Sequence, residues 1–291
     1  MYAGGVVTGP IARSARLTHL TTIYSMDLKL KGQVAIITGS STGIGKACAL
    51  GLAAEGVKIV INYHSSQEPA LEVKKQIEDL GGEAIAVQAD VSSEDDVKML
   101  FAACLEAYGH LDILVANAGM QMDAPFTEMT LQQWNTVLAV NLTGQFLACR
   151  EAARLFRKQG VHGHGRAAGK IICMSSVHDE IAWAGHVNYA TAKGGVKMMM
   201  ESMAQELSKD KIRINSISPG AIKTDINKDA WNTPEALNAL LKLVPYGRIG
   251  EGEDVANVCT FLASDVSDYI CGETVYVDGG MMLYPGFIGN G

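Results

Sequence analysis

Tyr189 and Lys193 have the residue types and the spacing of a proton-transfer pair. They lie four residues apart in a stretch predicted to be helical, so they share one helix face, one turn apart. A free tyrosine has a pKa of about 10, which is too high for a base at neutral pH, and a nearby ammonium lowers that pKa. The pair therefore suits a general acid/base that exchanges a proton with a hydroxyl or carbonyl oxygen.

Two adjacent serines precede this pair. Ser175 and Ser176 follow a predicted strand over 170–174, at the sheet edge where open α/β folds bind their ligands. Either hydroxyl could hydrogen-bond a substrate oxygen as charge develops on it. His178 lies two residues beyond Ser176, close enough to reach substrate hydroxyls. We therefore expect this strand end to contribute substrate contacts beside Tyr189.

A glycine-rich loop lies between the first predicted strand and the first predicted helix. Its sequence is Thr38-Gly39-Ser40-Ser41-Thr42-Gly43-Ile44-Gly45. Glycines let the backbone turn tightly and approach a ligand, and the N–H groups at the following helix N-terminus attract anions. In this context the loop predicts binding of a dinucleotide phosphate.

The elements that must position these groups alternate along the chain. Short apolar runs predict strands over 34–37, 57–61, 84–88, 111–116, 170–174, 212–217 and 274–277. Helical patterns lie between them, over 43–54, 67–80, 94–108, 131–157, 189–208 and within 234–263. Strands that are apolar throughout and separated by helices form a parallel sheet covered on both faces. We therefore predict an α/β fold, a single doubly wound Rossmann domain with seven parallel strands.

The two ends of this domain differ in composition. Residues 1–26 contain no Asp or Glu, and Met26 precedes the first predicted element, so we interpret 1–26 as an extension outside the catalytic fold. Residues 27–291 then form the single Rossmann domain. Within it, the segment over about 221–245 follows the sixth strand and is expected to cover the substrate.

Composition excludes several classes of protein. The net charge of −7 argues against nucleic acid as the main partner, because phosphate binding needs a concentrated basic face. No apolar run approaches the roughly 18 residues that span a bilayer, so no membrane partner is expected. His162 and His164 lie in a glycine-rich loop without carboxylate or cysteine neighbours, and no cysteines have CxxC spacing, so we predict no metal site. These features are typical of a cytoplasmic enzyme.

Taken together, the motifs resemble those of the short-chain dehydrogenase/reductase family, from about residue 30 to residue 280. The matching motifs are the TGxxxGxG loop, Asn117-Ala118-Gly119, Asn141, Ser175-Ser176-Val177, the YxxxK pair, and Pro219-Gly220 with Thr224. The resemblance selects Ser176 over Ser175 and implies that Lys193 also holds the ribose of a nicotinamide cofactor. It further implies that Asn141 holds a water that links Lys193 to solvent. The predicted catalytic residues are therefore Ser176, Tyr189, Lys193 and Asn141.

The end of the second strand bears on which nicotinamide cofactor is used. NAD-preferring enzymes place an acid there to bind the ribose 2′-hydroxyl, and this chain has Asn62, Tyr63 and His64 instead. We expect use of both NAD and NADP, with NADP somewhat preferred. Asp90-Val91 resembles the pair that contacts adenine. The predicted cofactor contacts are Gly39, Ser41, Thr42, Gly43, Ile44, Gly45, Asn62, Tyr63, His64, Asp90, Val91, Asn117, Ala118, Gly119, Tyr189, Lys193, Pro219, Gly220, Ile222 and Thr224.

Within the family, the stretch from Met174 to Gly195 resembles bacterial glucose 1-dehydrogenases. This resemblance implies oxidation of β-D-glucose at C1 to glucono-1,5-lactone, with Ser176, His178 and Tyr189 touching the substrate. Two alternatives stay open: an NADPH-dependent ketone reductase like the 3-oxoacyl carrier-protein reductases, and a non-catalytic NAD(P)-sensing protein. The family resemblance also implies a homotetramer built from the helices over 131–157 and 189–208.

Overall fold

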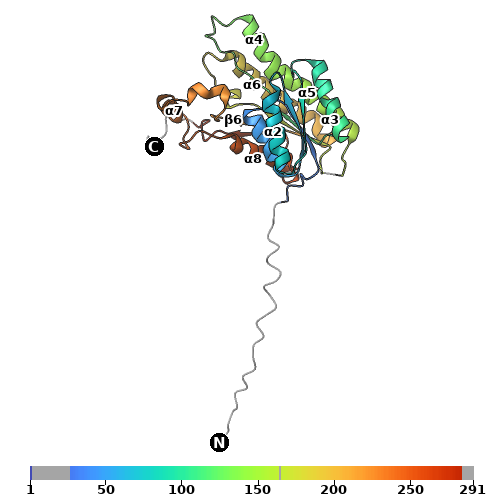
Figure 1. Ribbon diagram of the computed structural model, residues 1–291. Coiled ribbons are helices and arrows are strands. Elements are labelled where there is room, and N and C mark those ends of the chain that lie inside the picture. Colours follow the sequence, from blue (N-terminus) through green and yellow to red (C-terminus); the bar gives the residue numbers. More distant parts are fainter. Residues whose placement is uncertain (2–26, 164, 284–291) are drawn as a thin grey trace.

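The computed structural model describes residues 1, 27–163 and 165–283, and these form one parallel sheet with helices on both sides (Figure 1). The strands are β1 (Val34–Ile37), β2 (Lys58–Tyr63), β3 (Ala84–Gln88), β4 (Ile113–Ala116), β5 (Gly169–Met174), β6 (Ile212–Pro219) and β7 (Thr274–Val277). Their order is β3-β2-β1-β4-β5-β6-β7, and every neighbouring pair is parallel. The predicted fold class is confirmed. The extension proposed over 1–26 lies, apart from Met1, outside the described residues.

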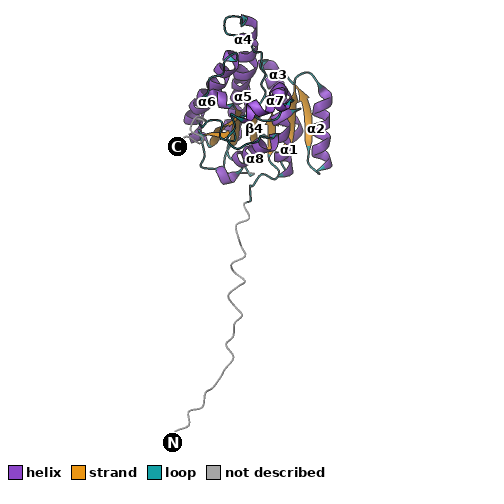
Figure 2. Cartoon of the chain, turned by 90° about the vertical axis from the view of Figure 1, so that its left-hand side faces the viewer, coloured by secondary structure: helices purple, strands orange, loops and turns teal. Residues whose placement is uncertain are grey.

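The described residues contain eight α-helices, and helices cover both faces of the sheet, as Figure 2 also shows. They are α1 (Gly43–Ala54), α2 (Gln67–Asp79), α3 (Glu94–Tyr108), α4 (Leu131–Leu138), α5 (Gly144–Gln159), α6 (Val187–Leu207), α7 (Pro234–Leu241) and α8 (Gly252–Ala263). Buried side chains of α1, α2 and α8 pack on one face of the sheet, and those of α3, α5 and α6 pack on the other. Because both faces are covered, β1 and β4 consist entirely of buried residues.

Helix boundaries follow from local chemistry. The hydroxyl of Ser93 accepts a hydrogen bond from the N–H of Asp96 (3.3 Å), and three acidic residues occupy the first turn of α3. The same helix ends at Gly109, whose φ of 78° lies in the left-handed region that favours glycine.

The prediction of one helix over 131–157 is wrong in one respect. A π-helical turn, Ala139–Thr143, separates α4 from α5. Asn141 lies in this turn and is fully buried, and its side-chain amide pairs with the backbone N–H and C=O of Met120 (2.8 and 2.9 Å). Pairing with a loop outside the helix accounts for the extra residue per turn, a feature that often marks functional sites.

The helical region predicted over 234–263 is likewise two helices, α7 and α8, with a loop between them. Gly247 in that loop has a φ of 81°, a conformation that a continuous helix of L-residues excludes. The part of the chain that the structure describes also contains four 3₁₀-helical segments, Val177–Asp179, Ser208–Asp210, Asp225–Ala230 and Asp265–Ser267. The first and third of these border the carboxyl ends of β5 and β6, where a ligand site of this fold is expected.

Gly169 offers a test of core packing. A Cβ added at this first residue of β5 would overlap the ring of Phe156, which is fully buried on α5. We expect Gly169→Ala to lower the free energy of unfolding by about 1–3 kcal/mol in urea denaturation, because the ring has no space to move. Gly163→Ala is the control, since nothing lies within 4 Å of its added Cβ. Equal stability of the two variants would contradict this packing.

Candidate active site

One large cavity, of about 1450 Å³, opens at the carboxyl ends of the strands. Every site residue predicted from the sequence lines this main cavity, except Asn141. The lining residues come from segments that follow β1, β2, β3, β4, β5 and β6, so the parallel sheet gathers motifs from most of the chain.

The glycine loop forms the start of this cavity. Gly39 and Gly43 have φ values of 61° and 55°, which favour glycine. A Cβ at Gly39 would lie 2.9 Å from the Cα of Ala118, and one at Gly45 would overlap the carbonyl of Gly39. The first turn of α1 contains no acidic residue, and no side chain caps its free N–H groups. Such a cradle fits the diphosphate of a dinucleotide.

Asn117 fastens this loop to β4. Its side-chain Nδ2 donates to the carbonyls of Thr38 (2.9 Å) and Gly39 (3.1 Å). In return, the Thr38 hydroxyl accepts from the backbone N–H groups of Asn117 (2.9 Å) and Ala118 (3.0 Å). The loops after β1 and β4 are therefore one hydrogen-bonded unit.

Asn62, at the end of β2, also ties the glycine loop to a neighbouring segment. Its Oδ1 accepts from the N–H of Gly39 (3.0 Å), and its Nδ2 donates to the carbonyl of Ala89 (3.0 Å). The side chain is almost fully buried and saturated by the protein. Asn62 lines the cavity as predicted, but its side chain shapes the loop and has little capacity left for a ligand.

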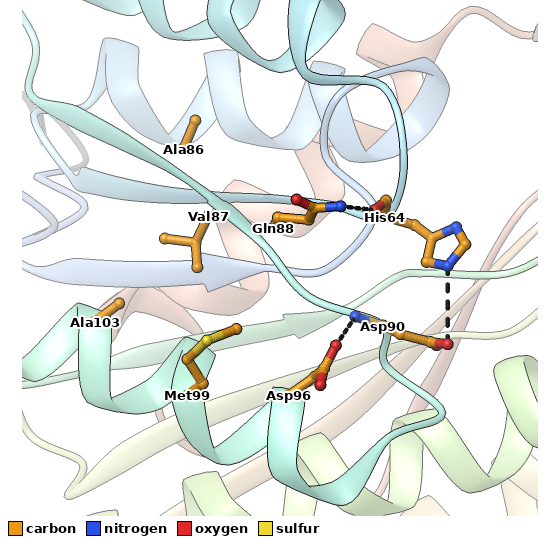
Figure 3. A pocket seen from close by; sticks show the side chains of 8 residues that line it. All are labelled: His64, Ala86, Val87, Gln88, Asp90, Asp96, Met99 and Ala103. Carbon is orange, nitrogen blue, oxygen red and sulfur yellow. Dashed lines mark hydrogen bonds and ion pairs between the residues drawn. The ribbon is translucent and has the colours of Figure 1, made fainter.

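His64 and Asp90 face each other at the far end of the main cavity (Figure 3). His64 Nε2 lies 3.8 Å from Asp90 Oδ2, and both side chains are exposed to solvent. Burial raises the pKa of Asp90, but hydrogen bonds from Ser92 and the charge of His64 outweigh it and hold this pKa below its ordinary value. An anion brought to His64 therefore meets a competing carboxylate.

A second hollow, of about 610 Å³, lies beside this pair, between β3 and α3 (Figure 3). It is lined by His64, Ala86, Val87, Gln88, Asp90, Asp96, Met99 and Ala103. Asp96 accepts a hydrogen bond from the backbone N–H of Asp90 (2.9 Å). The first turn of α3 therefore holds the loop that contains Asp90 in place.

Ser176, Tyr189 and Lys193 meet at the centre of the main cavity. The Ser176 hydroxyl hydrogen-bonds the phenol of Tyr189 and also accepts from the N–H of His178 (3.3 Å). Lys193 Nζ lies 5.5 Å from the centre of the Tyr189 ring and donates to the carbonyl of Met174 (2.8 Å). The three predicted side chains are therefore brought together from β5 and α6.

Ser175 has a different environment from its neighbour. Its hydroxyl donates to the backbone carbonyl of Lys193 (3.2 Å), which ties the end of β5 to α6. That hydroxyl is therefore committed to a helix carbonyl, whereas the Ser176 hydroxyl lies next to the phenol of Tyr189.

Burial dominates the electrostatics of this centre. Burial lowers the pKa of Lys193 to about 8, and the charge of Asp179 opposes this effect. Burial also raises the pKa of Tyr189, whereas the hydrogen bond from Ser176 lowers it. The expected lowering of the Tyr189 pKa by Lys193 is not seen: burial is the largest effect on this pKa, and the group that opposes it is Ser176.

Aromatic rings form one wall of the cavity beyond Tyr189. Trp183 stacks between His178 and His186, at ring-centre distances of 4.3 and 3.4 Å. His178 Nδ1 lies 3.0 Å from the carbonyl of Ile181, so its neutral form donates there and leaves Nε2 as an acceptor. Burial lowers the pKa of His178, which favours that neutral form.

The rest of the substrate end is mainly apolar. The sequence motifs did not identify eight of the lining residues, which are Met120, Gln121, Thr136, Val140, Ile181, Met281, Met282 and Leu283. The segment over 221–245 adds Ile226, Asn227, Ala230, Leu240 and Leu243. Sequence offers no signal for them, because an apolar residue that lines a cavity has the same type as one in the core.

Two searches of the described residues bear on other chemistries. None of their helices has the length and apolarity to cross a bilayer. Their His, Cys, Asp and Glu side chains form no group of three or more that could hold a metal ion.

Comparison with known proteins extends this picture. The family model described as enoyl-(acyl carrier protein) reductase matches residues 39–282. The chain is 44% identical over 258 residues to 3beta-hydroxysteroid dehydrogenase 1 of Eggerthella lenta, covering 89% of this chain and 97% of that protein. It is 40% identical over 257 residues to glucose 1-dehydrogenase 2 of Bacillus subtilis, with 88% and 97% covered. It is 41% identical over 256 residues to 3-oxoacyl-[acyl-carrier-protein] reductase of Synechocystis, with 88% and 99% covered.

Solved structures agree with these sequence relatives. A gluconate 5-dehydrogenase from Burkholderia cenocepacia, solved in complex with NADP and tartrate, is 33% identical, with a TM-score of 0.81 and coverage of 89% of this chain and 99% of that one. A short-chain type dehydrogenase/reductase from Mycobacterium marinum is 32% identical, with a TM-score of 0.82 and the same two coverages. The chain therefore belongs to the short-chain dehydrogenase/reductase family of NAD(P)-dependent oxidoreductases, as its motifs predicted.

Proposed function

We propose that the protein interconverts an alcohol and its carbonyl form at the centre made by Ser176, Tyr189 and Lys193. The observation that carries this proposal is their convergence in the cavity that also holds the glycine loop. The Tyr189 phenol exchanges a proton with the reacting oxygen, and the Ser176 hydroxyl hydrogen-bonds that oxygen as charge develops. When bound, the nicotinamide supplies or accepts the hydride.

Lys193 and Asn141 have supporting roles in this proposal. The Lys193 ammonium stabilises the phenolate of Tyr189 and binds the ribose of the cofactor. Asn141 holds a water that connects Lys193 to solvent. Since its side-chain amide is used by Met120, we assign the water to the backbone of the π-helical turn.

The cofactor contacts follow the cavity from the glycine loop to His64. Pro219, Gly220, Ile222 and Thr224 would flank the nicotinamide, and Asp90-Val91 the adenine. The absence of an acid at the end of β2 supports use of both cofactors, and His64 supports a modest preference for NADP. The nearby carboxylate of Asp90 keeps that preference modest, because it competes with a phosphate for His64.

β-D-glucose, oxidised at C1 to glucono-1,5-lactone, is the first substrate we propose. The glucose 1-dehydrogenase relatives of Bacillus subtilis and Gluconobacter oxydans support it, as do the polar groups of His178 and Gln121 in the cavity. A sugar needs several such partners, since each of its buried hydroxyls must be paired.

A hydrophobic ketone is the second candidate, and the lining of the cavity specifically favours it. Trp183, Ile226, Leu240, Leu243 and Leu283 suit a substrate with a hydrocarbon body. The relatives named for hydroxysteroid oxidation and 3-oxoacyl thioester reduction support this class. In both cases the segment over 221–245 would cover the bound substrate.

We further propose that the enzyme is a cytoplasmic homotetramer. Phe146 on α5 and Met198 on α6 are exposed apolar side chains on the helices expected to form the subunit contacts. Burying such residues against a second subunit would remove apolar surface from water.

Activity assays at 340 nm test the substrate and the enzyme class together. We expect reduction of NADP+ and NAD+ with D-glucose, or oxidation of NADPH with an acetoacetyl thioester. Tyr189→Phe should lower kcat by about 10²–10⁴-fold and keep cofactor binding, because only proton transfer is lost. Tyr269→Phe, at a fully exposed site, is the control. Cofactor binding without turnover of any substrate in the unmodified protein would favour the sensing alternative.

Substitution of His64 tests the cofactor preference. His64→Arg should raise the ratio of kcat/KM for NADP+ over NAD+ by about tenfold, because a guanidinium pairs with phosphate in a bidentate way. His64→Asp should reverse the preference through repulsion of the 2′-phosphate. The measurement is initial rates with each cofactor. An unmodified enzyme with more than about tenfold preference for NAD+ would contradict the proposal.

Burial of Lys193 gives a prediction about stability. Its pKa is about 8 in the folded protein and 10.5 for an ordinary lysine, so keeping it charged opposes folding below pH 8, and this cost disappears above pH 10.5. Lys193→Met should therefore abolish turnover and raise the free energy of unfolding at pH 7 by about 1–3 kcal/mol. The carbonyl of Met174 keeps a donor in Gln145 (2.9 Å).

Urea denaturation at pH 7 and pH 10.5 checks this sign. The stability gain of Lys193→Met should shrink at the higher pH, because the folded lysine is then neutral and the fold no longer buries an ammonium. Lys209→Met, at an exposed position, should change neither value. A loss of stability in Lys193→Met at pH 7 would show that burial of the ammonium is not the dominant cost.

A further inference from the structure

Asp179 lies three residues after Ser176 and belongs to none of the family motifs. It ends the turn Val177–Asp179, which begins immediately after Ser176, and its backbone N–H donates to the carbonyl of Ser176 (2.9 Å). Its own carbonyl packs on α6, where a Cβ added at Gly194 would lie 3.8 Å away. The backbone of Asp179 therefore links the Ser176 turn to the residue next to Lys193.

The carboxylate of Asp179 is held from the other side by two hydroxyls. Ser218 Oγ, fully buried on β6, donates to Oδ2 (2.5 Å), and the phenol of Tyr276 on β7 donates to Oδ1 (3.1 Å). Burial and the charge of Asp179 raise the pKa of Tyr276 to about 12, so this phenol stays a donor at neutral pH. The ends of β5, β6 and β7 are thus joined through one carboxylate.

This carboxylate also acts on the titrating groups of the centre. Its charge raises the pKa of Lys193 against the effect of burial, and it raises that of Tyr189. The other acidic groups near the centre are Cys173 beside Lys193 and Asp123 beside Tyr189. Asp123 acts on Tyr189 and not on Lys193, which leaves Asp179 as the main negative charge acting on Lys193.

Two further neighbours complete the surroundings. His178, in the same turn, has its pKa lowered by burial and is favoured in its neutral form. Glu180 forms an ion pair with Lys197 on α6, and the pKa of that lysine is raised by Glu180 and, less strongly, by the charge of Asp179. Neither residue replaces the charge of Asp179 at the centre.

We propose that Asp179 is a positioning residue, whose carboxylate, held by Ser218 and Tyr276, fixes the Ser176 turn and supplies the negative charge that balances the buried Lys193 ammonium. The inference rests on the proposed catalytic function of Ser176 and Lys193. Asp179 itself touches neither substrate nor cofactor in this assignment.

The first test is independent of turnover. The pKa of Lys193 is measured by NMR of ¹³C-labelled lysine in the full-length protein, with Lys193→Met identifying its signal. Asp179→Asn keeps the size of the side chain but removes its charge, so the pKa of Lys193 should fall below that of the unmodified protein. Glu180→Gln removes the adjacent charge, which is already paired with Lys197, and should leave the pKa of Lys193 unchanged. An unchanged Lys193 titration in Asp179→Asn, or an equal change in Glu180→Gln, overturns the proposal.

The second test uses the pH profile of kcat with whichever substrate the assays identify. Loss of the charge favours the Tyr189 phenolate, so the rising limb of alcohol oxidation should move to lower pH by at least about half a unit. kcat should fall about tenfold as Ser176 loses its support, with KM for the cofactor unchanged. Asp179→Glu should return the rising limb of the pH profile to its position in the unmodified enzyme, because it restores the negative charge.

The two tests separate the possible failures. If no substrate turns over in the unmodified protein, the proposed function fails while the lysine titration still decides the role of Asp179. Asp179→Asn could lower kcat without moving the rising limb of the pH profile, with Asp179→Glu equally impaired. In that case Asp179 has only a structural role and the proposal is wrong.

Discussion

The parallel pairing of β1 with β4 is the constraint on which the rest of the site depends. The strand order β3-β2-β1-β4-β5-β6-β7 reverses direction at this pair, so the loops that follow the two strands leave toward opposite sides. Hydrogen bonds between Asn117 and the Thr38–Gly39 backbone hold the two loops together at the reversal. The crevice for a dinucleotide is therefore a property of sheet topology, which a few polar side chains make rigid.

Desolvation disfavours the charged forms of the two titratable groups at the proposed reaction centre. A buried ammonium at Lys193 and a buried phenol at Tyr189 are both shifted toward their neutral forms by desolvation. The Ser176 hydroxyl opposes this shift at Tyr189, and the charge of Asp179 opposes it at Lys193 while adding to it at Tyr189. Active sites often concentrate such shifted groups, because a pKa near the working pH makes proton exchange efficient.

Comparison of sequence with structure separates two kinds of residue at the site. The glycines at 39, 43 and 45 can be recognised from the sequence, because only glycine tolerates the backbone angles or the close backbone contacts at these positions. Asn62 was correctly placed at the cavity, yet its side chain turned out to be saturated by Gly39 and Ala89. Asn141 was expected in a regular helix, and its pairing with the Met120 backbone instead produces a π-helical turn. Contacts between segments far apart in sequence decided both outcomes.

By itself, the sequence determined the alternation of strands and helices, the glycine-rich loop between the first strand and the first helix, and the spacing of Tyr189 and Lys193, with two adjacent serines as candidates. These features are local: they depend on residue types at fixed spacings along one element or one turn. Only the tertiary structure decided that Ser175 tethers α6 while Ser176 meets Tyr189, that Met281–Leu283 join the substrate wall, and that Asp179 binds Ser218 and Tyr276. The physical reason is that the direction of a hydroxyl and the burial of a charge depend on which distant segments pack against them, and spacing along the chain carries no record of that packing.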